Sequence, residues 1–209
     1  MRKTHDVIVI GGGSAGYAAA RTARDAGAEV AIVDQGPLGG LCILRGCMPT
    51  KAILRSAEVA ALLKRAKEFG LSPVSVRADL SAVVDRKDRL VREFADYRIQ
   101  QLRDPRLTLY QSRAVFQSPH EIAIGSMVLS AGSVILATGS KPSEVPIPGL
   151  AGAGYFTSDT ILDLRIHPDS LIVLGGGKAH LPAPRSFSQA IASFIACNRQ
   201  GIHHMHLFT

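Results

Sequence analysis

Apolar runs and helical periodicities alternate along the early part of the chain. Residues 6–10 (DVIVI) form an apolar, β-branched run that ends in three glycines, which is typical of a buried parallel strand. Residues 15–26 carry small side chains at helical spacing, and residues 29–34 (EVAIVD) form a second apolar run. The pattern predicts a strand, a helix packed closely on it and a second strand, which together make a βαβ unit.

Two longer helices are predicted next. After Pro49, apolar side chains repeat with a helical period, so we expect a helix over residues 50–69 that ends at Gly70. Residues 79–102 form a second helical stretch, highly charged on one face. Because acidic and basic residues interleave at 85–89 (DRKDR), this face is expected to lie in solvent.

From residue 107 onward the pattern predicts strands instead of helices. Residues 107–115, 121–124 and 127–129 are short β-like runs separated by Ser-Pro-His and Gly-Ser, which predicts a small antiparallel meander. Residues 133–137 (SVILA) return to a buried strand.

A second nucleotide-binding start is predicted near the end of this pattern. Residues 141–154 are rich in Pro and Gly and are expected to connect two domains. Residues 170–174 (SLIVL) then read as another buried strand, and three glycines follow it at 175–177. A strand followed by three glycines therefore occurs twice, which is a stronger signal for nucleotide binding than either copy alone.

The first glycine motif has the spacing of a dinucleotide site. Gly11, Gly13 and Gly16 form G-x-G-x-x-G between a strand and a helix, where the glycines allow a tight turn, close approach to a pyrophosphate and close helix packing. Asp34 ends the second strand, 23 residues after Gly11, where a carboxylate can accept hydrogen bonds from ribose hydroxyls. The alternative is a glycine-rich turn without a ligand; the flanking strand, helix and acid favour the dinucleotide.

Cys42 and Cys47 are the candidate redox pair. Residues five apart on a regular helix have Cα atoms roughly 8–9 Å apart, from helical rise and radius, and disulfides need less than about 7 Å. If these thiols pair, the segment must be distorted, and Gly46 and Pro49 provide that freedom. The helix dipole and Lys51 would favour a thiolate at Cys47. The spacing alone leaves two other interpretations open, namely ordinary buried cysteines or half of a metal site.

Four segments, in order between residues 5 and 177, carry a family resemblance. They are VIVIGGGSAGYAAA (7–20), GGLCILRGCMPTK (39–51), VILATGSKP (134–142) and LIVLGGG (171–177). Together they resemble the class I pyridine-nucleotide disulfide oxidoreductases, which include dihydrolipoamide dehydrogenase, glutathione reductase and mercuric reductase. The resemblance implies an α/β fold: a Rossmann-like FAD-binding domain with a small antiparallel β-meander, followed by an incomplete second Rossmann-like unit.

The same resemblance implies roles for individual residues. Cys47 would face the flavin, Cys42 would attack the substrate, and Lys51 would lie near the flavin ring. NAD(P)H would donate electrons, which would pass through FAD and the Cys42–Cys47 disulfide to a small-molecule disulfide or related acceptor. The implied cofactor-binding residues are Gly11, Gly13, Ser14, Ala15, Gly16, Asp34, Gly40, Lys51, Thr138 and Gly139 for FAD, and Gly175 and Gly177 for NAD(P)H.

The chain departs from the family pattern between the cysteines. Family members often carry Asn-Val there, where this chain has Leu44-Arg45, which argues against a standard lipoamide or glutathione substrate. Asp34 stands where Glu is more usual and keeps the carboxylate.

The pattern also breaks after the second glycine run. His180 takes the third glycine position, and Pro182 and Pro184 follow where a crossover helix should run. We therefore expect residues from about Lys178 onward to come from a frameshift or an aberrant gene end. The rest of the NAD(P) domain and the interface domain of the homodimeric family, with its His–Glu acid–base pair, would then be missing.

Three parts of the chain are predicted on this basis. They are an FAD-binding domain at 1–155 with its redox segment at 39–51, the start of an NAD(P)-binding domain at 156–180, and an aberrant tail at 181–209. Within the tail, Cys197 is expected to have no role. The histidine cluster is read as chance rather than as a metal site, and its members are His203, His204 and His206.

Composition excludes few functions. The net charge is +7, but basic and acidic residues interleave, and with no Trp and 5% aromatic residues a stacking platform for nucleic acid is hard to build. The apolar run at 7–10 is too short for a signal peptide, and no stretch approaches the length of a membrane span. We expect a cytoplasmic protein that binds neither nucleic acid nor membrane.

Three functions compete for this chain. They are a flavin-dependent disulfide oxidoreductase, a fragment that binds FAD without turnover, and a flavin oxidase or monooxygenase that does not use the cysteines. The paired cysteines favour the first for ancestry, and the expected loss of the acid–base pair favours the second for the isolated chain. A nucleic-acid binder has only the net charge in its favour.

Overall fold

The computed structural model describes the chain as two compact units. The described residues are 2–72, 75, 77–144, 146–168 and 170–174, with the backbone of 205–208. The first unit comprises Met1–Met48 and Val91–Asp159, and the second comprises Pro49–Leu90 and Thr160–Thr209. Within the described residues, no helix combines the length and the hydrophobicity needed to cross a membrane.

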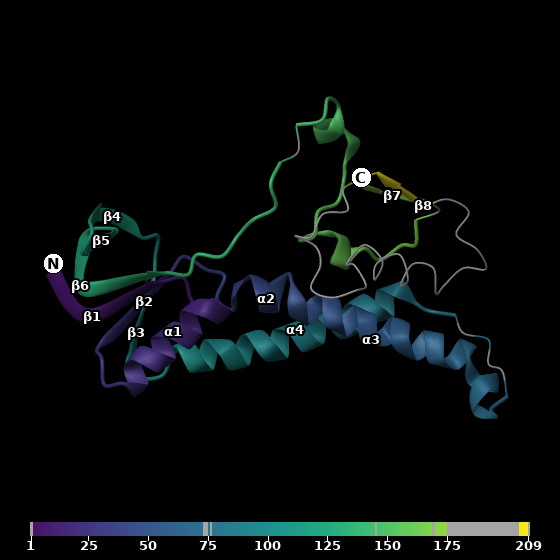
Figure 1. Ribbon diagram of the computed structural model, residues 1–209, viewed down its shortest axis with the longest axis horizontal. Coiled ribbons are helices and arrows are strands. Elements are labelled where there is room, and N and C mark those ends of the chain that lie inside the picture. The colour runs from purple at the N-terminus through teal and green to yellow at the C-terminus, as the bar shows by residue number, and fades with distance from the viewer. Residues whose placement is uncertain are drawn as a thin grey trace. The chain divides into compact units, whose positions relative to one another are not determined.

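The first unit is built on a six-stranded sheet with the order β3-β2-β1-β6-β5-β4 (Figure 1). Strands β3, β2, β1 and β6 are parallel to one another, and β5 and β4 continue the sheet as an antiparallel meander. The strands are β1 (Arg2–Ile10), β2 (Val30–Asp34), β3 (Leu107–Gln111), β4 (Val115–Ser118), β5 (Glu121–Ile124) and β6 (Met127–Leu136). This is the predicted α/β, Rossmann-like arrangement. The prediction was wrong about the first run of the meander, because residues 107–111 form β3, which pairs in parallel with β2. The antiparallel meander consists of β4, β5 and the start of β6.

Alternate residues of the central strands form two cores. Ile8 and Val33 belong to a cluster with the inner residues of the meander, Ile122 and Leu129 among them. Their neighbours along β1 and β2 point to the other face, because successive strand residues alternate. That face is packed by α1 (Ser14–Asp25) and by the end of α4 (Leu80–Leu102), whose Leu102 is fully buried. The apolar runs of the sequence are therefore buried on both sides, as parallel strands usually are.

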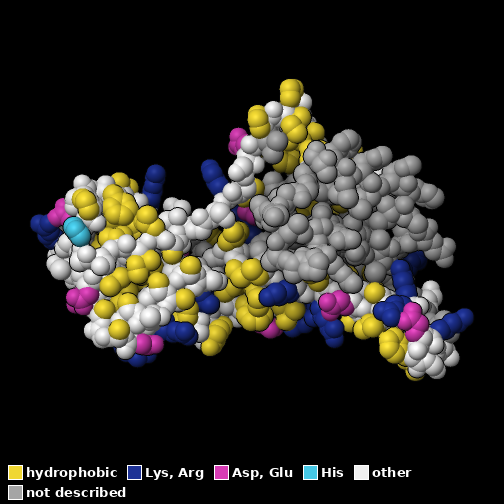
Figure 2. Space-filling model, in the orientation of Figure 1, with side chains coloured by type: hydrophobic (Ala, Val, Ile, Leu, Met, Phe, Trp, Pro, Cys, Tyr) yellow, Lys and Arg dark blue, Asp and Glu magenta, His cyan; other side chains and the backbone are white. Residues whose placement is uncertain are grey.

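Strand β6 differs from the prediction in two ways. Residues 127–129 and 133–137 were expected as separate strands, but β6 is continuous because its pairing with β1 extends from Val128 to Leu136. Its second half was also expected to be buried, yet Ile135 and Leu136 are 36% and 66% exposed. The β5 pairing stops at Ser130, so within the described residues the end of β6 has a strand on one side only. Hydrophobic side chains consequently reach the surface of the molecule (Figure 2).

The helix predicted over residues 50–69 differs from the structure at both ends. Its last part is a separate 3₁₀ turn, η1 (Ala66–Phe69), which ends at Gly70 as predicted; Gly70 is in the left-handed conformation. The helix α3 (Cys47–Lys64), however, begins three residues before the predicted 50. Pro49 lies in its first turn, where the backbone N–H groups have no helical partner, so a missing N–H costs little. The remaining helical elements are α2 (Gly40–Leu44), η2 (Leu150–Ala153) and η3 (Ile161–Asp163).

The second unit is held by a small core and by ion pairs. Ile53 and Ala57 of α3 pack with Leu80 and with Leu162 of η3. Lys87 is only 4% exposed and its ammonium group contacts the carboxylates of the neighbouring Asp88 and of Asp163. This buried charge is thus compensated, as burial of an ammonium group requires.

The same unit contains a pair of parallel strands, β7 (Leu171–Leu174) and β8 (Met205–Phe208). The prediction of a buried strand at 170–174 was wrong about burial, because Ile172 and Leu174 are 61% and 49% exposed. No strand was predicted in the tail, so β8 is an addition to the predicted elements.

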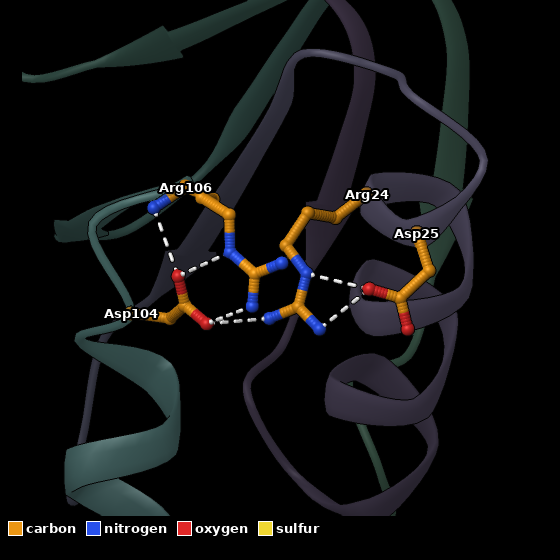
Figure 3. Close-up of polar contacts among 4 residues, drawn as sticks. All are labelled: Arg24, Asp25, Asp104 and Arg106. Carbon is orange, nitrogen blue, oxygen red and sulfur yellow. Dashed lines mark hydrogen bonds and ion pairs between the residues drawn. The ribbon is translucent and has the colours of Figure 1, made fainter.

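Two arginines and two aspartates of the first unit form a hydrogen-bonded network between α1 and the turn that joins α4 to β3 (Figure 3). The Arg24 guanidinium of α1 is 10% exposed and donates to Asp25 and, at 2.7 Å, to Asp104 in the turn between α4 and β3. The Arg106 side chain donates to both oxygens of Asp104, and its backbone N–H also donates to that carboxylate. The side-chain hydrogen bonds from Arg106 are the largest cause, and its backbone hydrogen bond the next, of a pKa of Asp104 that is lowered to about 2. The carboxylate therefore stays charged and ties α1 to the α4–β3 turn.

Candidate cofactor and dithiol site

The glycine motif forms a tight loop between β1 and α1. Gly11 has a φ of +108°, and a Cβ on it would lie 2.2 Å from the carbonyl oxygen of Ala137. A Cβ on Gly16 would lie 1.7 Å from the carbonyl oxygen of Gly11. Both neighbours are backbone atoms that cannot rotate away, so only glycine fits at these two positions.

The start of α1 is suited to an anion. Its N-cap, Gly13, offers no side-chain cap to the helix, and the first turn contains no acidic residue. Ser14 and Ala15 in this turn are exposed. Because the first N–H groups of a helix lack helical partners and carry partial positive charge, this end can accept a phosphate group.

The redox segment packs directly on this loop. Gly40, the first residue of α2, has a φ of +75°, and a Cβ on it would lie 2.4 Å from the Cα atom of Gly13. The two backbones are therefore in contact, with no side chain between them. The segment that bears the cysteines is thus fixed beside the glycine loop.

Asp34 binds the loop itself. Its Oδ2 accepts a hydrogen bond of 2.5 Å from the Gly12 N–H, and its Oδ1 accepts one of 2.6 Å from the Gly36 N–H. Hydrogen bonds to a carboxylate are among the stronger ones in proteins. Asp34 was predicted to bind a ribose, and its bonds to the loop were not foreseen, because backbone donors leave no trace in the residue pattern. The ribose contact stays a prediction.

The predicted FAD-binding residues Thr138 and Gly139 follow β6 at the same edge of the sheet. The Ala137 N–H donates to the Ile10 carbonyl at 2.8 Å, which brings the end of β6 against the glycine loop. Thr138 and Gly139 are exposed, and Gly139 has a φ of +75°. Open α/β sheets bind ligands outside the carboxyl ends of their strands, and this is where the loop, Asp34 and these two residues gather.

The two cysteines lie on either side of a helix break. Helix α2 ends at Leu44 and α3 begins at Cys47, so the segment is interrupted in the way that pairing of the two thiols would require. A Cβ on Gly46 would lie 3.5 Å from the Cα atom of Cys42, so the connection folds back over α2. Both residues are present as thiols, Cys42 half-buried and Cys47 exposed. Lys51 follows Cys47 by one turn of α3 and is exposed.

An ion pair beside the cysteines was not foreseen. The Arg45 guanidinium lies 3.5 Å from the Asp159 carboxylate, and the two side chains are 53% and 18% exposed. In the sequence, Arg45 stands out only as a departure from the family pattern. Its partner is 114 residues away, and a single sequence contains no signal for such a pairing.

Several predicted residues lie outside the described part of the chain. They are Gly175, Gly177, Cys197, His203 and His204; His206 lies in β8, of which only the backbone is described. Among the residues that are described, no group of three or more His, Cys, Asp or Glu side chains is arranged to hold a metal ion.

Comparison with known proteins identifies the family. The family described as pyridine nucleotide-disulphide oxidoreductase matches residues 5–179, which is well over half of the chain. The chain belongs to this family. It is therefore an oxidoreductase by descent, and the resemblance inferred from the four sequence segments is confirmed.

Individual relatives agree with this assignment. Dihydrolipoyl dehydrogenase from Acholeplasma laidlawii is 35% identical over 182 residues, which cover 85% of this chain and 54% of the relative. The enzyme of the same name from Chlamydia muridarum is 36% identical, with 85% and 39% covered. Mercuric reductase from Lysinibacillus sphaericus is 34% identical over 174 residues, with 83% and 32% covered. The chain thus spans between about a third and about half of these relatives' lengths.

Solved structures show the same fold. The HOCl-induced flavoprotein disulfide reductase RclA from Escherichia coli superposes with a TM-score of 0.74 at 26% identity, covering 92% of this chain and 40% of that one. Its Cu(II) complex superposes with a TM-score of 0.75 at 26% identity, covering 94% and 41%.

Proposed function

We propose that this chain is the flavin-binding and dithiol-bearing part of an FAD-dependent oxidoreductase. Electrons would pass from NAD(P)H through FAD to the Cys42–Cys47 disulfide and on to a small-molecule disulfide or related acceptor. The observation that carries the proposal is the backbone contact between Gly13 and Gly40. This contact fixes the cysteine segment beside the loop that is suited to a dinucleotide.

The residues of the first unit fit an FAD molecule. Gly11 and Gly16 keep side chains away from the turn, and the uncapped start of α1, with Ser14 and Ala15, would hold the pyrophosphate. Asp34 holds the loop in shape and would bind the ribose, with Gly40, Thr138 and Gly139 nearby. Bound FAD would supply a two-electron carrier between the nicotinamide and the disulfide.

The cysteines would carry out the thiol–disulfide exchange. Cys42 would attack the acceptor, and Cys47 would close the internal disulfide that is then reduced again. Cys47 is the first residue of α3, where the helix dipole favours a thiolate. Lys51, one turn further along the helix, adds a positive charge.

The proposed domain bounds follow the same scheme. The FAD-binding domain would comprise residues 1–155 with the redox segment 39–51, and an NAD(P)-binding domain would begin within 156–180, where Gly175 and Gly177 would approach NAD(P)H. Relatives of this chain are named for different substrates, dihydrolipoyl groups in some and mercury in another. The family alone therefore does not select the acceptor.

Absorption spectroscopy tests the proposal. The purified chain is mixed with FAD, and the visible spectrum is recorded before and after anaerobic reduction with a dithiol. We expect bound flavin, and a long-wavelength charge-transfer band after reduction that Cys47→Ser abolishes and Cys42→Ser retains.

Two results would contradict the proposal in different ways. A folded chain that binds no flavin would rule out FAD as the cofactor of this chain. Bound flavin without the band, together with NAD(P)H oxidation unchanged in Cys42→Ser, would remove the disulfide mechanism and leave a flavin oxidase or monooxygenase.

A further inference from the structure

The redox segment is positively charged. Between Gln35 and Ala57 the chain contains three basic residues and no Asp or Glu. One of them, Arg45, lies between the two cysteines, in the break that separates α2 from α3. A charge in this position is close in sequence to both reacting thiols.

The Arg45 guanidinium is engaged only weakly by the protein. It is 53% exposed, and its ion pair with Asp159 is 3.5 Å long. Direct hydrogen bonds between a guanidinium and a carboxylate are about 2.7–2.9 Å long. A guanidinium has five N–H donors, and exposed ion pairs contribute little to stability. The Asp159 contact therefore leaves most of the binding capacity of Arg45 available to a ligand.

We propose that Arg45 binds an anionic group of the acceptor, so that the dithiol prefers disulfides that carry a carboxylate close to the sulfur atoms. The planar guanidinium matches a carboxylate with two parallel hydrogen bonds. Arg45 is a substrate-binding residue in this scheme, and the cysteines perform the exchange. The inference rests on the proposed dithiol function.

The exchange itself is balanced. The Cys42 thiolate attacks one sulfur of the acceptor, a Cys42–acceptor disulfide forms, and the acceptor's S–S bond breaks with the electron pair leaving on the first thiolate. The Cys47 thiolate then attacks Cys42, which forms the internal disulfide and releases the second thiolate. Two electrons pass from the dithiol to the acceptor, and the protons lost by the two cysteines are available to the two products.

The test compares two chromogenic disulfides that differ in charge. Dithiobis(nitrobenzoate) carries two carboxylates, and dithiodipyridine is neutral in mildly alkaline buffer. The chain is reduced, freed of reductant under argon and mixed rapidly with each probe in a Cys197→Ser background, so that only the two cysteines react. We expect Arg45→Gln to slow the anionic probe about two- to fivefold, the size of one exposed charge pair, and to leave the neutral probe unchanged.

Two control variants separate local binding from general attraction. Arg45→Lys keeps the charge and should retain most of the rate with the anionic probe. Arg21→Gln removes the same charge from an exposed position on α1 and should have no effect. The Arg45 effect should also shrink from about 0.01 M to about 1 M salt, because the Debye length falls from about 30 Å to about 3 Å.

Three outcomes would overturn the inference: equal slowing of both probes by Arg45→Gln, equal slowing of the anionic probe by Arg21→Gln, or no change with either probe. This experiment involves no flavin. A missing charge-transfer band alongside a clear probe preference would therefore contradict the flavin part of the proposed function and leave the dithiol and the role of Arg45 standing. A clear charge-transfer band without a probe preference would contradict the role of Arg45 and leave the proposed function standing.

Discussion

Replacing Gly16 by alanine places a methyl group against backbone that cannot move out of its way. Gly16 lies in the first turn of α1, and its new Cβ would be 1.7 Å from the Gly11 carbonyl oxygen and 3.3 Å from the Ala137 Cβ. Helix α1 can relieve the overlap only by shifting away from β1 and β6. That shift would open the core formed by Val9, Ala20 and Ile32.

The size of the effect follows from the depth of this overlap. Inserting one methyl group into a packed core usually costs about 1–3 kcal/mol, and occasionally more. Here the added carbon would sit well inside the contact distance of a rigid carbonyl oxygen, so we expect a loss of about 3 kcal/mol or more in the free energy of unfolding. With a urea dependence of about 1–3 kcal/mol per molar, the unfolding midpoint should fall by roughly 1–3 M.

Urea unfolding followed by circular dichroism measures this change, with Gly132→Ala as the matched control. Gly132 is in β6, and a Cβ on it would meet its nearest neighbour, the Asp6 carbonyl oxygen, at an ordinary 3.6 Å. Its substitution should change the free energy of unfolding by less than about 1 kcal/mol. Flavin fluorescence should also show weaker FAD binding in Gly16→Ala than in the control. Equal midpoints for the two variants would refute the reasoning about this loop.

Three further changes have defined outcomes. Asp34→Asn should cost about 1–3 kcal/mol in urea unfolding and weaken FAD binding in a fluorescence titration, because an amide has one acceptor oxygen for the two N–H groups that face it; unchanged affinity would contradict this. Asp104 has a lowered pKa of about 2, so its contribution to stability is present above about pH 4 and is lost as the pH falls towards 2. The thermal unfolding midpoint of Arg106→Gln should therefore lie below that of the wild type above pH 4 and approach it near pH 2. A difference between the two midpoints that stays constant with pH would contradict this coupling. Leu102→Ala should lower the free energy of unfolding by about 2–5 kcal/mol, since the side chain is fully buried; a loss below about 1 kcal/mol would mean that the site collapses around the cavity.

Local pattern predicted the elements that local chemistry controls. The β1–α1–β2 unit came from two apolar runs around a glycine motif, and the five-residue spacing of the cysteines indicated a distorted segment on the condition that the two thiols pair. The same pattern predicted the starts and ends of the elements less accurately. Helix α3 includes Pro49, because a first turn tolerates a residue without an N–H. Strand β6 runs through Ser-Ala-Gly-Ser, because its pairing with β1 extends past these residues to Leu136 and outweighs their weak strand propensity.

The sequence by itself determined the family and the α/β fold, and it supplied the residues proposed to bear the chemistry, because these inferences depend on residue type and short spacing. Only the tertiary structure decided what those residues touch. It placed Gly40 on Gly13, bound Asp34 to the backbone of its own loop and brought Asp159 beside Arg45. It also left the end of β6 exposed. Such contacts depend on how distant segments pack, and a local hydrophobic pattern carries no information about which distant partner a side chain meets.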